Sequence, residues 1–497
     1  RIFTRRFPDR VAVVHSALSD SDRWSQLNKV RSGAASILIG PRSAVFGPFK
    51  NLKLIIVDEE HDTSYKQSSG LSYHGRDVAV LRGRIEKALV VMGSATPSLE
   101  SYQNALSGRY QLIEMLERVT GRPLPTVNVI VPQQKQQRQS GLLISSGDSR
   151  QTMPVLSASD AEIPMQPEVI EALTENLAAG RQAIVLVNRR GYAYYLFSVY
   201  EKKAVVCPQC SISMTLHARS TVLRCHYCDS SQSVAALMAE NPDQKYIAVG
   251  YGSQKAEDAL KKHVQGARIV RLDSDAVVDR ELLPQTLERF RAGEIDILVG
   301  TQILAKGHDF PNVTLIVVLE VDQLLGLPDF RAGERAFQLL VQSAGRAGRA
   351  ELSGRVIMQT MRPNHQVLAA AIRQDYAAFV DHELEFRRAH SYPPFARMIA
   401  IEFNSTNIQK LNKLVEEMES WLENGAKARP ELFKQVRMLG PAVPPIETIR
   451  GRHRRQVIFS SPQLPPLRTL VGWFARDFQK LGGDLRMRID VDPQSLI

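Results

Sequence analysis

The chain has 497 residues, with 63 Lys and Arg against 52 Asp and Glu, which gives a net charge of +11 and an isoelectric point near 9.5. This length predicts about three domains, and the basic balance favours a polyanionic partner without proving one. No apolar run approaches the roughly 20 residues of a membrane span, and residues 1–10 lack the apolar core of a signal peptide. We therefore expect a cytoplasmic protein with no membrane segment.

Residues 10 to about 118 alternate short aliphatic runs with helical stretches. This alternation is the βα pattern of a parallel sheet. Leu54 to Val57 predicts a strand buried on both faces, and Asp58 and Glu59 follow at its carboxyl end, where open α/β sheets hold ligands. In a nucleoside triphosphatase, the first carboxylate would hold Mg²⁺ and the second would polarise the attacking water. An acidic turn after a core strand is the alternative.

The rest of the chain predicts three further regions. Residues 122–165 are rich in Gln, Ser and Pro and show no steady period, so we expect a linker. A second α/β block covers residues 166–365 and includes the strand KYIAVG (245–250), while an insertion near 197–245 carries all the cysteines. Residues 366–497 open with helical sequence and end in strands, which predicts an α+β domain.

Two glycine-punctuated segments of the second block could meet a nucleotide. GTQILAKGHDFPNV (300–313) follows a strand, and QSAGRAGR (342–349) follows helical sequence. Their small residues let the backbone approach a ligand, and Arg346 and Arg349 can share one helical face. A guanidinium there could reach a transferring phosphoryl group across a cleft. Taken alone, either segment could be an ordinary turn.

The chain has four cysteines: Cys207, Cys210, Cys225 and Cys228. Their spacing is C-x₂-C-x₁₄-C-x₂-C, and two such turns can present four thiolates as a tetrahedron, which predicts a closed structural zinc site. Disulfides are the alternative, disfavoured because nothing points to an oxidising compartment. His217 and His226 are possible nitrogen ligands, but four thiolates already fill the coordination shell.

Two stretches combine residues that suit a nucleic acid. In residues 64–77, aromatic rings could stack on unpaired bases and cations could hold phosphates. In residues 450–456, a basic strip could neutralise phosphates. The candidates are Tyr65, Lys66, Tyr73 and Arg76 in the first stretch and Arg450, Arg452, Arg454 and Arg455 in the second. A solvated loop with packed tyrosines and a solvated charged face are the alternatives.

Taken together, the motifs resemble those of superfamily two helicases. They are GPRSAVF (40–46), DEEH (58–61), GSATPS (93–98), the 300–313 segment and QSAGRAGR. Their combination with HSALSDSDRW (15–24), YHGRDVAVLR (73–82) and the paired cysteines is similar to the PriA family of replication-restart helicases, over nearly the whole chain. The resemblance implies an α/β protein with two RecA-like lobes, the first (1–121) incomplete, a zinc-binding module inserted in the second, and an α+β C-terminal domain that binds DNA and partners.

The resemblance also implies ATP-driven 3' to 5' unwinding of stalled or abandoned forks, followed by loading of the replicative helicase. ATP and Mg²⁺ would lie between the lobes and be served by Asp58, Glu59, Arg346 and Arg349. Nucleotide state would be transmitted to DNA through His61, Ser94, Thr96, Gly307 and Asp309. The implied partners are forked and single-stranded DNA, single-stranded DNA-binding protein and other primosome proteins.

The chain departs from the family pattern in two ways. No G-x-x-x-x-G-K-[ST] phosphate loop occurs, whereas in the family it precedes the segment that matches Phe7 onward. We therefore expect a chain truncated at its N-terminus that does not hydrolyse ATP alone, and an ATPase-dead module that binds forks and recruits partners is the alternative function. The family carries eight cysteines for two zinc ions, but Ser198, Glu201, Met238 and Asn241 stand where the outer pairs fall. This predicts one zinc ion per chain.

Overall fold

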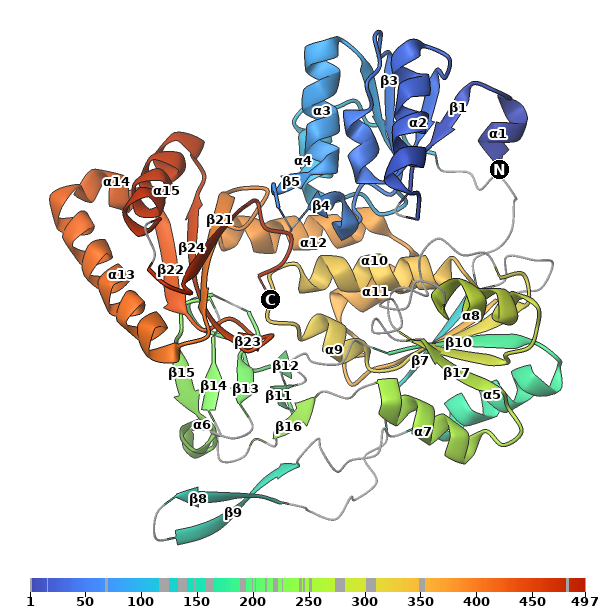
Figure 1. The fold of residues 1–497 in the computed structure, drawn as a ribbon. Helices are drawn as coiled ribbons and strands as arrows, with labels where there is room; N and C mark the ends of the chain where they lie inside the picture. Colours follow the sequence, from blue (N-terminus) through green and yellow to red (C-terminus); the bar gives the residue numbers. More distant parts are fainter. Residues whose placement is uncertain are drawn as a thin grey trace. The chain divides into compact units, whose positions relative to one another are not determined.

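The computed structural model divides into two compact units, Arg1–Leu112 and Ile113–Ile497 (Figure 1). It describes residues 2–496 except for 16, 68–69, 116–124, 133–140, 147–148, 157–164, 188–193, 199, 202, 211, 218–221, 226, 241–243, 245, 250–252, 273–281, 301–309, 348–353 and 480–481. Gly307, Asp309 and Arg349 therefore lie outside the described residues, as do His226 and Asn241. Within the described ranges, no helix is long and apolar enough to cross a membrane.

The first unit contains two pairs of parallel strands, as the βα alternation predicts. Its elements are α1 (Ile2–Arg6), β1 (Val11–Val13), α2 (Asp20–Ser32), β2 (Ile37–Ile39), the 3₁₀ helix η1 (Arg42–Phe46), β3 (Leu54–Val57), the 3₁₀ helix η2 (Thr63–Tyr65), β4 (Lys66–Gln67), β5 (Tyr73–His74), α3 (Gly75–Glu86), β6 (Leu89–Met92) and α4 (Leu99–Leu106). β1 pairs with β2, and β3 pairs with β6. A third pair, β4 with β5, is antiparallel and short.

The burial predicted for β3 is wrong on one face. Leu54 is 47% exposed and Ile56 is 64% exposed, whereas Val57 is buried. Helix α3 packs against β3 and β6, and its buried residues include Ala79 and Gly83. An aliphatic run predicts a strand, but the number of covered faces depends on neighbouring layers, which local sequence does not specify.

The second unit is built around a six-stranded parallel sheet with the strand order β17-β18-β10-β19-β20-β7. Its elements are β7 (Thr126–Ile130), α5 (Pro167–Ala178), β10 (Gln182–Leu186), α7 (Ser253–His263), β17 (Ile269–Leu272), α8 (Leu282–Arg291), β18 (Ile297–Gly300), β19 (Val313–Val318), α9 (Val321–Leu325), α10 (Ala332–Ala344) and β20 (Arg355–Gln359). Strands β10, β18 and β19 are buried throughout, as expected of a parallel sheet covered on both faces. Helices α5 and α7 cover one face, and α10 lies on the other side (Figure 1).

The structure differs from the expected linker over residues 122–165. Strand β7 forms an edge of the parallel sheet, where Val127 and Val129 pair with Val356 and Met358. Strands β8 (Gly141–Ser146) and β9 (Ser149–Leu156) form an antiparallel pair. The sequence TVNVI has the alternation of a short strand, but its Gln-, Ser- and Pro-rich surroundings obscured it.

The cysteine-bearing insertion forms most of a second sheet. It contains β11 (Tyr194–Ser198), β12 (Lys203–Ala204), β13 (Thr215–His217), β14 (Val222–Arg224), β15 (Ser231–Ser233), α6 (Val234–Glu240) and β16 (Tyr246–Val249). Strands β9 and β8 extend this sheet because β9 pairs in parallel with β16. β16 was expected in the sheet of the helicase lobe, but it pairs antiparallel with β11 and belongs to this second sheet. Its apolar pattern identified a strand but not the sheet to which it belongs.

The C-terminal region is the predicted α+β domain. Its elements are α11 (Gln366–Arg373), α12 (Tyr376–Ala389), β21 (Arg397–Ser405), α13 (Ile408–Ala428), α14 (Pro430–Lys434), β22 (Arg437–Ala442), β23 (Thr448–Ile449), β24 (Arg452–Ser461), α15 (Leu464–Phe478) and β25 (Arg486–Val491). The antiparallel sheet has the order β22-β24-β21-β25, with β23 on β24. Helices α13 and α15 lie on one side of it (Figure 1), and Phe403, Phe459 and Phe474 are fully buried in the core between them.

Candidate nucleotide-coupling and zinc sites

The DEEH turn starts at the carboxyl end of β3 and separates its acidic side chains into two environments. Asp58 is exposed, and its Oδ1 accepts a hydrogen bond of 3.0 Å from the Glu59 amide. Glu59 has a left-handed backbone, with φ of 47°, and its side chain is 47% exposed. Glu60 and His61 are buried. The turn therefore leaves Asp58 exposed and Glu59 partly exposed, with Glu59 Oε2 3.6 Å from His61 Nδ1, and it directs Glu60 and His61 into the unit.

Glu60 joins this turn to two helices. Its Oε1 accepts a 2.6 Å hydrogen bond from the Ser98 amide at the start of α4, and its Oε2 accepts one of 2.8 Å from Ser101 Oγ. The Arg76 guanidinium, from α3, lies 3.1 Å from the same Oε2. No role was assigned to Glu60 from sequence. Its position as the third residue of the DEEH motif marks Glu60 as a candidate. The sequence does not reveal its partners, however, because Ser98 and Ser101 are 38 and 41 residues away.

The same network contradicts the DNA contact expected of Arg76. Its side chain is 9% exposed, and it donates to Asp77 and Ser98 as well as to Glu60. A guanidinium engaged in this way is unavailable to a phosphate without breaking a buried ion pair. The sequence could not show this, because Arg76 lies in the first turn of α3 and its carboxylate partner is 16 positions away in the chain.

His61, Ser94 and Thr96, which were predicted to act together, do meet. His61 Nδ1 lies 2.6 Å from Ser94 Oγ, which also accepts a 2.9 Å hydrogen bond from the Thr96 amide. The Glu60 amide donates to the Gly93 carbonyl over 3.1 Å. Thr96 is fully buried. The DEEH and GSATPS segments are therefore hydrogen-bonded to each other at several points.

A small hairpin of β4 and β5 is attached to the same turn. The Tyr65 hydroxyl donates a 2.7 Å hydrogen bond to the Asp58 carbonyl, and burial together with the charge of Asp58 raises the pKa of Tyr65. Tyr65 stacks on His74 with ring centroids 6.5 Å apart. Arg42 donates to the carbonyls of Ser64 and Lys66 over 2.6 and 3.0 Å. The aromatic segment predicted to sense DNA is therefore tied to the carboxylate turn.

In the second unit, Arg346 lies in the turn that follows α10, and its amide donates to the Ser343 carbonyl over 3.0 Å. Helix α10 is held at its other end by a buried network. Arg387 is fully buried and contacts Glu334 and Glu383 over 2.8 and 3.0 Å. The helix that carries Arg346 is therefore firmly anchored to the C-terminal region.

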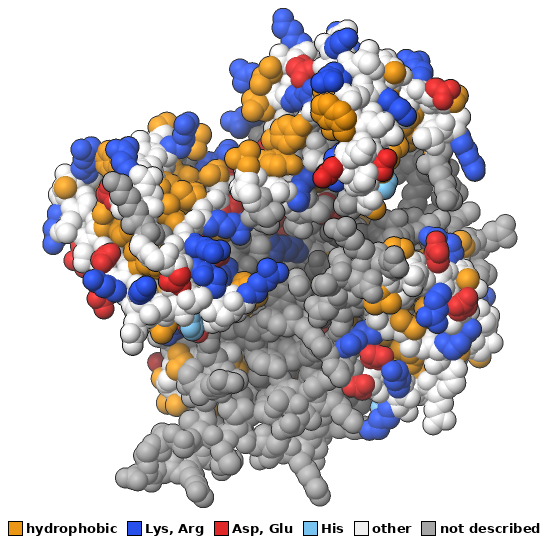
Figure 2. All heavy atoms as spheres, in the orientation of Figure 1, with side chains coloured by type: hydrophobic (Ala, Val, Ile, Leu, Met, Phe, Trp, Pro, Cys, Tyr) orange, Lys and Arg blue, Asp and Glu red, His pale blue; other side chains and the backbone are white. Residues whose placement is uncertain are grey.

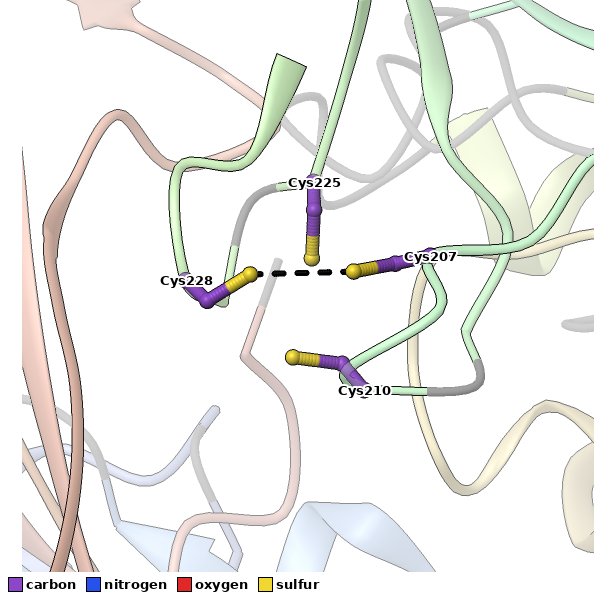
Figure 3. Close-up of side chains that lie close together, drawn as sticks. All are labelled: Cys207, Cys210, Cys225 and Cys228. Carbon is purple, nitrogen blue, oxygen red and sulfur yellow. Dashed lines mark hydrogen bonds between the residues drawn. The ribbon is translucent and has the colours of Figure 1, made fainter. Parts of the chain in front are cut away.

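The four cysteines form one cluster (Figure 3). Their sulfur atoms all lie within 4.8 Å of one another, and Cys207 Sγ is 3.6 Å from Cys228 Sγ. All four thiols are free, which contradicts the disulfide alternative. Thiolates around a tetrahedral zinc ion at 2.3 Å would be separated by about 3.8 Å, so this donor set fits structural zinc with no open position. The two C-x₂-C turns lie between β12 and β13 and between β14 and β15.

The zinc cluster is bonded to the rest of the second unit. The Tyr392 hydroxyl donates a 2.7 Å hydrogen bond to the Cys210 carbonyl, and Tyr392 stacks on Phe330 with centroids 4.8 Å apart. The Phe330 amide donates to the Tyr227 hydroxyl over 3.2 Å. Among the positions expected for outer cysteines, Ser198 Oγ donates to Gln244 over 2.7 Å, and Met238 packs against the core. Neither side chain is a thiolate or an imidazole, the donors that structural zinc sites use.

The basic strip of β24 is largely engaged within the domain. Arg454 forms an ion pair with Glu402 over 2.7 Å and is 11% exposed. Arg452 donates to Asn404 Oδ1 over 2.6 Å, and Arg455 donates to Asn412 over 3.1 Å. Only Arg450, among the four candidates, is exposed, in a turn with φ of 50°. Arg452 and Arg454 contact β21, and Arg455 contacts α13. The structure therefore does not support the strip as a continuous phosphate-binding surface.

Four family models match the chain. They are the DEAD/DEAH box helicase over residues 2–105, the PriA DNA helicase Cys-rich region domain over 207–232, the helicase conserved C-terminal domain over 229–351 and the primosomal protein N C-terminal domain over 388–494. Among solved structures, RecG bound to a three-way DNA junction aligns with 77% of this chain and 40% of its own, at 15% identity and a TM-score of 0.37.

Curated relatives match almost the whole chain. Replication restart protein PriA of Bacillus subtilis is 35% identical over 490 residues, which cover 99% of this chain and 58% of that protein. The Chlamydia pneumoniae protein of the same name is 36% identical, with 99% and 63% coverage. That of Treponema pallidum is 33% identical, with 99% and 70% coverage. The chain thus spans less than two thirds of the first two relatives.

The parallel sheets, the bonded DEEH and GSATPS segments and the cysteine module define the class: a helicase with a RecA-like α/β fold and a zinc-binding module. The family follows from the Cys-rich and C-terminal domain matches and from the 70% coverage of the Treponema relative. The chain belongs to the PriA family.

Proposed function

We propose that the chain is the core of an ATP-driven DNA helicase that restarts replication. It would unwind stalled or abandoned forks in the 3' to 5' direction and load the replicative helicase. The curated relatives are replication restart proteins, which supports the proposal. The carrying observation is the bonded path from the open carboxylates to the aromatic hairpin, through the Tyr65 hydroxyl on the Asp58 carbonyl.

In this proposal each part of the path has a role. Asp58 would hold Mg²⁺, and Glu59 would polarise the attacking water. Arg346 and Arg349 would serve the γ-phosphate. His61, Ser94 and Thr96, together with Gly307 and Asp309, transmit nucleotide state to DNA. One zinc ion, held by the four cysteines, stabilises the module without taking part in the reaction.

The proposed partners follow from the same function. They are forked and single-stranded DNA, single-stranded DNA-binding protein and other primosome proteins, and the place of action is the cytoplasm. The remaining candidate DNA contacts are Tyr65 at the end of η2, Lys66 and Tyr73 in the hairpin, and Arg450 in the C-terminal domain. Arg452, Arg454 and Arg455 are assigned to the stability of that domain.

Unwinding by the protein isolated from its source cells tests the proposal. A labelled fork is mixed with the wild-type protein and with E59Q, and binding, ATP hydrolysis and strand separation are measured. We expect E59Q to bind the fork as the wild type does but to lose hydrolysis and unwinding, because the amide cannot polarise water. Wild-type protein that binds forks without hydrolysing ATP would instead support the binding-module alternative.

A further inference from the structure

The segment that follows β25 crosses from the C-terminal domain to the helicase lobe of the second unit. β25 ends at Val491, and Asp492 adopts a left-handed backbone with φ of 50°, which turns the chain out of the sheet. The Asp492 amide donates to the Met398 carbonyl over 2.9 Å, and the Asp492 carboxylate accepts from Arg397 Nε over 3.0 Å and from Arg397 Nη2. A two-bond arginine–carboxylate contact fixes direction. The course of the terminal segment (residues 492–496) is therefore set within the C-terminal domain.

The other end of the terminal segment lies against the loop between α9 and α10 (Figure 1). In this loop the Asp329 side chain is fully buried, and its Oδ2 accepts hydrogen bonds of 3.3 Å from Ser495 Oγ and 3.4 Å from the Leu496 amide. Arg335, in the first turn of α10, forms a 3.2 Å ion pair with the same oxygen and donates to the Gln494 carbonyl. Consecutive residues of the terminal segment therefore bond to one carboxylate and to the arginine paired with it.

The same contact has an apolar part. Leu496 is 4% exposed and belongs to a buried cluster with Phe330 and Tyr392. Phe330 follows Asp329 in the chain, so the polar and the apolar contacts are made by the same loop. Chain ends usually fray unless such contacts hold them. The terminal segment is therefore packed as part of the protein interior.

Helix α10 connects this loop to the candidate arginine of the nucleotide site. Its first turn carries Arg335, and Arg346 lies in the turn that follows its last residue. An α-helix is stiff because each turn is hydrogen-bonded to the next, so a contact at one end affects the position of the other. Figure 2 shows Lys and Arg side chains on the surface of the C-terminal domain, which suits a polyanion. A pull on that domain would reach α10 through the terminal segment.

We propose that Asp329 is a positioning residue for Arg346, because it holds the terminal segment and so makes the C-terminal domain and α10 move together. The proposal rests on the proposed function, in which Arg346 would serve the γ-phosphate, and deepens it by naming the contact through which the C-terminal domain acts on that site. Asp329 itself does not meet the nucleotide. Its loss would widen the range of positions open to Arg346, and a displacement of about 1 Å can slow an enzyme about 100-fold.

Hydrogen exchange of the 497-residue chain tests the contact. Deletion of residues 494–497 and L496A should each make the amides of α10 exchange about tenfold faster, because one end of the helix loses its attachment. Peptides from β21 and β24 should keep their wild-type exchange. Q494A is the matched control, since Gln494 accepts from Arg335 through its backbone carbonyl, which alanine retains. Unchanged exchange in α10, or faster exchange throughout the C-terminal domain, would overturn the proposal.

A double-variant cycle tests whether Asp329 acts through the terminal segment. D329N alone should speed the exchange of α10, and D329N combined with the deletion should speed it little further, because both changes remove the same contact. Effects that add in full would overturn Asp329 as the residue that holds the segment.

Steady-state kinetics of the wild-type protein and its variants, isolated from the source cells, separates positioning from stability. L496A should lower kcat for DNA-stimulated ATP hydrolysis about tenfold and leave the KM for ATP and the zinc content unchanged, since the lost interaction is made in the transition state. Q494A should match the wild type. An unchanged kcat together with faster exchange in α10 would overturn the positioning role and leave the proposed function standing. Absence of hydrolysis by the wild-type protein would overturn both.

Discussion

The Arg76 guanidinium and the Glu60 carboxylate are 3.1 Å apart, with side chains 9% and 2% exposed. This ion pair lies at the meeting point of the DEEH turn, α3 and the start of α4. Ser98 and Ser101 occupy further lone pairs of Glu60. A buried charge is tolerated when its partners are complete, and its cost appears when one partner is removed. Arg76 and Glu60 therefore stabilise the folded first unit.

We therefore predict that R76M destabilises the first unit by about 3–5 kcal/mol, because Glu60 is left buried without its counter-ion. Hydrogen exchange of peptides from residues 54–106 measures the effect. R84A is the control, since Arg84 is exposed on the same helix. The double variant E60Q/R76M should lose less than the sum of its single variants. Additive losses would contradict the predicted pairing.

The cysteine cluster predicts one zinc ion per chain, measured by elemental analysis of the purified protein. C225S should lose the ion, because three thiolates no longer close the tetrahedron. S198A should retain one equivalent. Chelation should also increase hydrogen exchange around Phe330 and Tyr392, which contact the module. Two equivalents of zinc in the wild type would contradict the count.

The first unit should become less stable as the pH falls below 6.5. Burial and the nearby Arg76 charge lower the pKa of His74 to about 4. Between these values the unfolded chain binds a proton that the folded chain does not, so the free energy of unfolding falls by about 2 kcal/mol from pH 7 to pH 5. Hydrogen exchange at the two pH values measures it. H74Q should remove this dependence, whereas H15Q, at an exposed histidine, should retain it.

Within the basic strip, we expect Arg450 to contact DNA and Arg454 to stabilise the C-terminal domain. R450A should weaken DNA binding modestly and lower the salt slope by up to about one, because only this side chain of the four is exposed. R454A should leave the slope unchanged and destabilise the C-terminal domain, since Glu402 loses its partner. Urea unfolding and a salt series of fork binding distinguish the two. A lower slope for R454A would contradict the assignment.

The 497-residue chain should release no phosphate from ATP in the presence of DNA. None of its residues forms the G-x-x-x-x-G-K-[ST] loop, whose backbone amides and lysine hold the β- and γ-phosphates. A phosphate-release assay on the purified chain, with D58N as the background control, checks this. DNA-stimulated release that D58N abolishes would show that another segment anchors the nucleotide.

Much of the fold and the candidate site was predictable because the signals are local. The βα alternation, the C-x₂-C turns and the order of the helicase motifs each depend on residues a few positions apart. The meeting of His61, Ser94 and Thr96 agrees with what the motif resemblance implied. The role of Glu60 and the burial of Arg76 were missed, since both depend on partners in other elements.

By itself, then, the sequence determined the class of most segments, the donor set for zinc and the family, because spacing and residue type carry that information. The strands within residues 122–165 were the exception. Only the tertiary structure showed that β7 and β16 belong to different sheets. It also showed that Arg454 forms an ion pair with Glu402 and that the Phe46 ring packs edge-to-face on Tyr73. The physical reason is that burial and partner choice are set by contacts between residues far apart in the chain. The identity of a charged or aromatic residue does not show which partner it contacts in the folded protein.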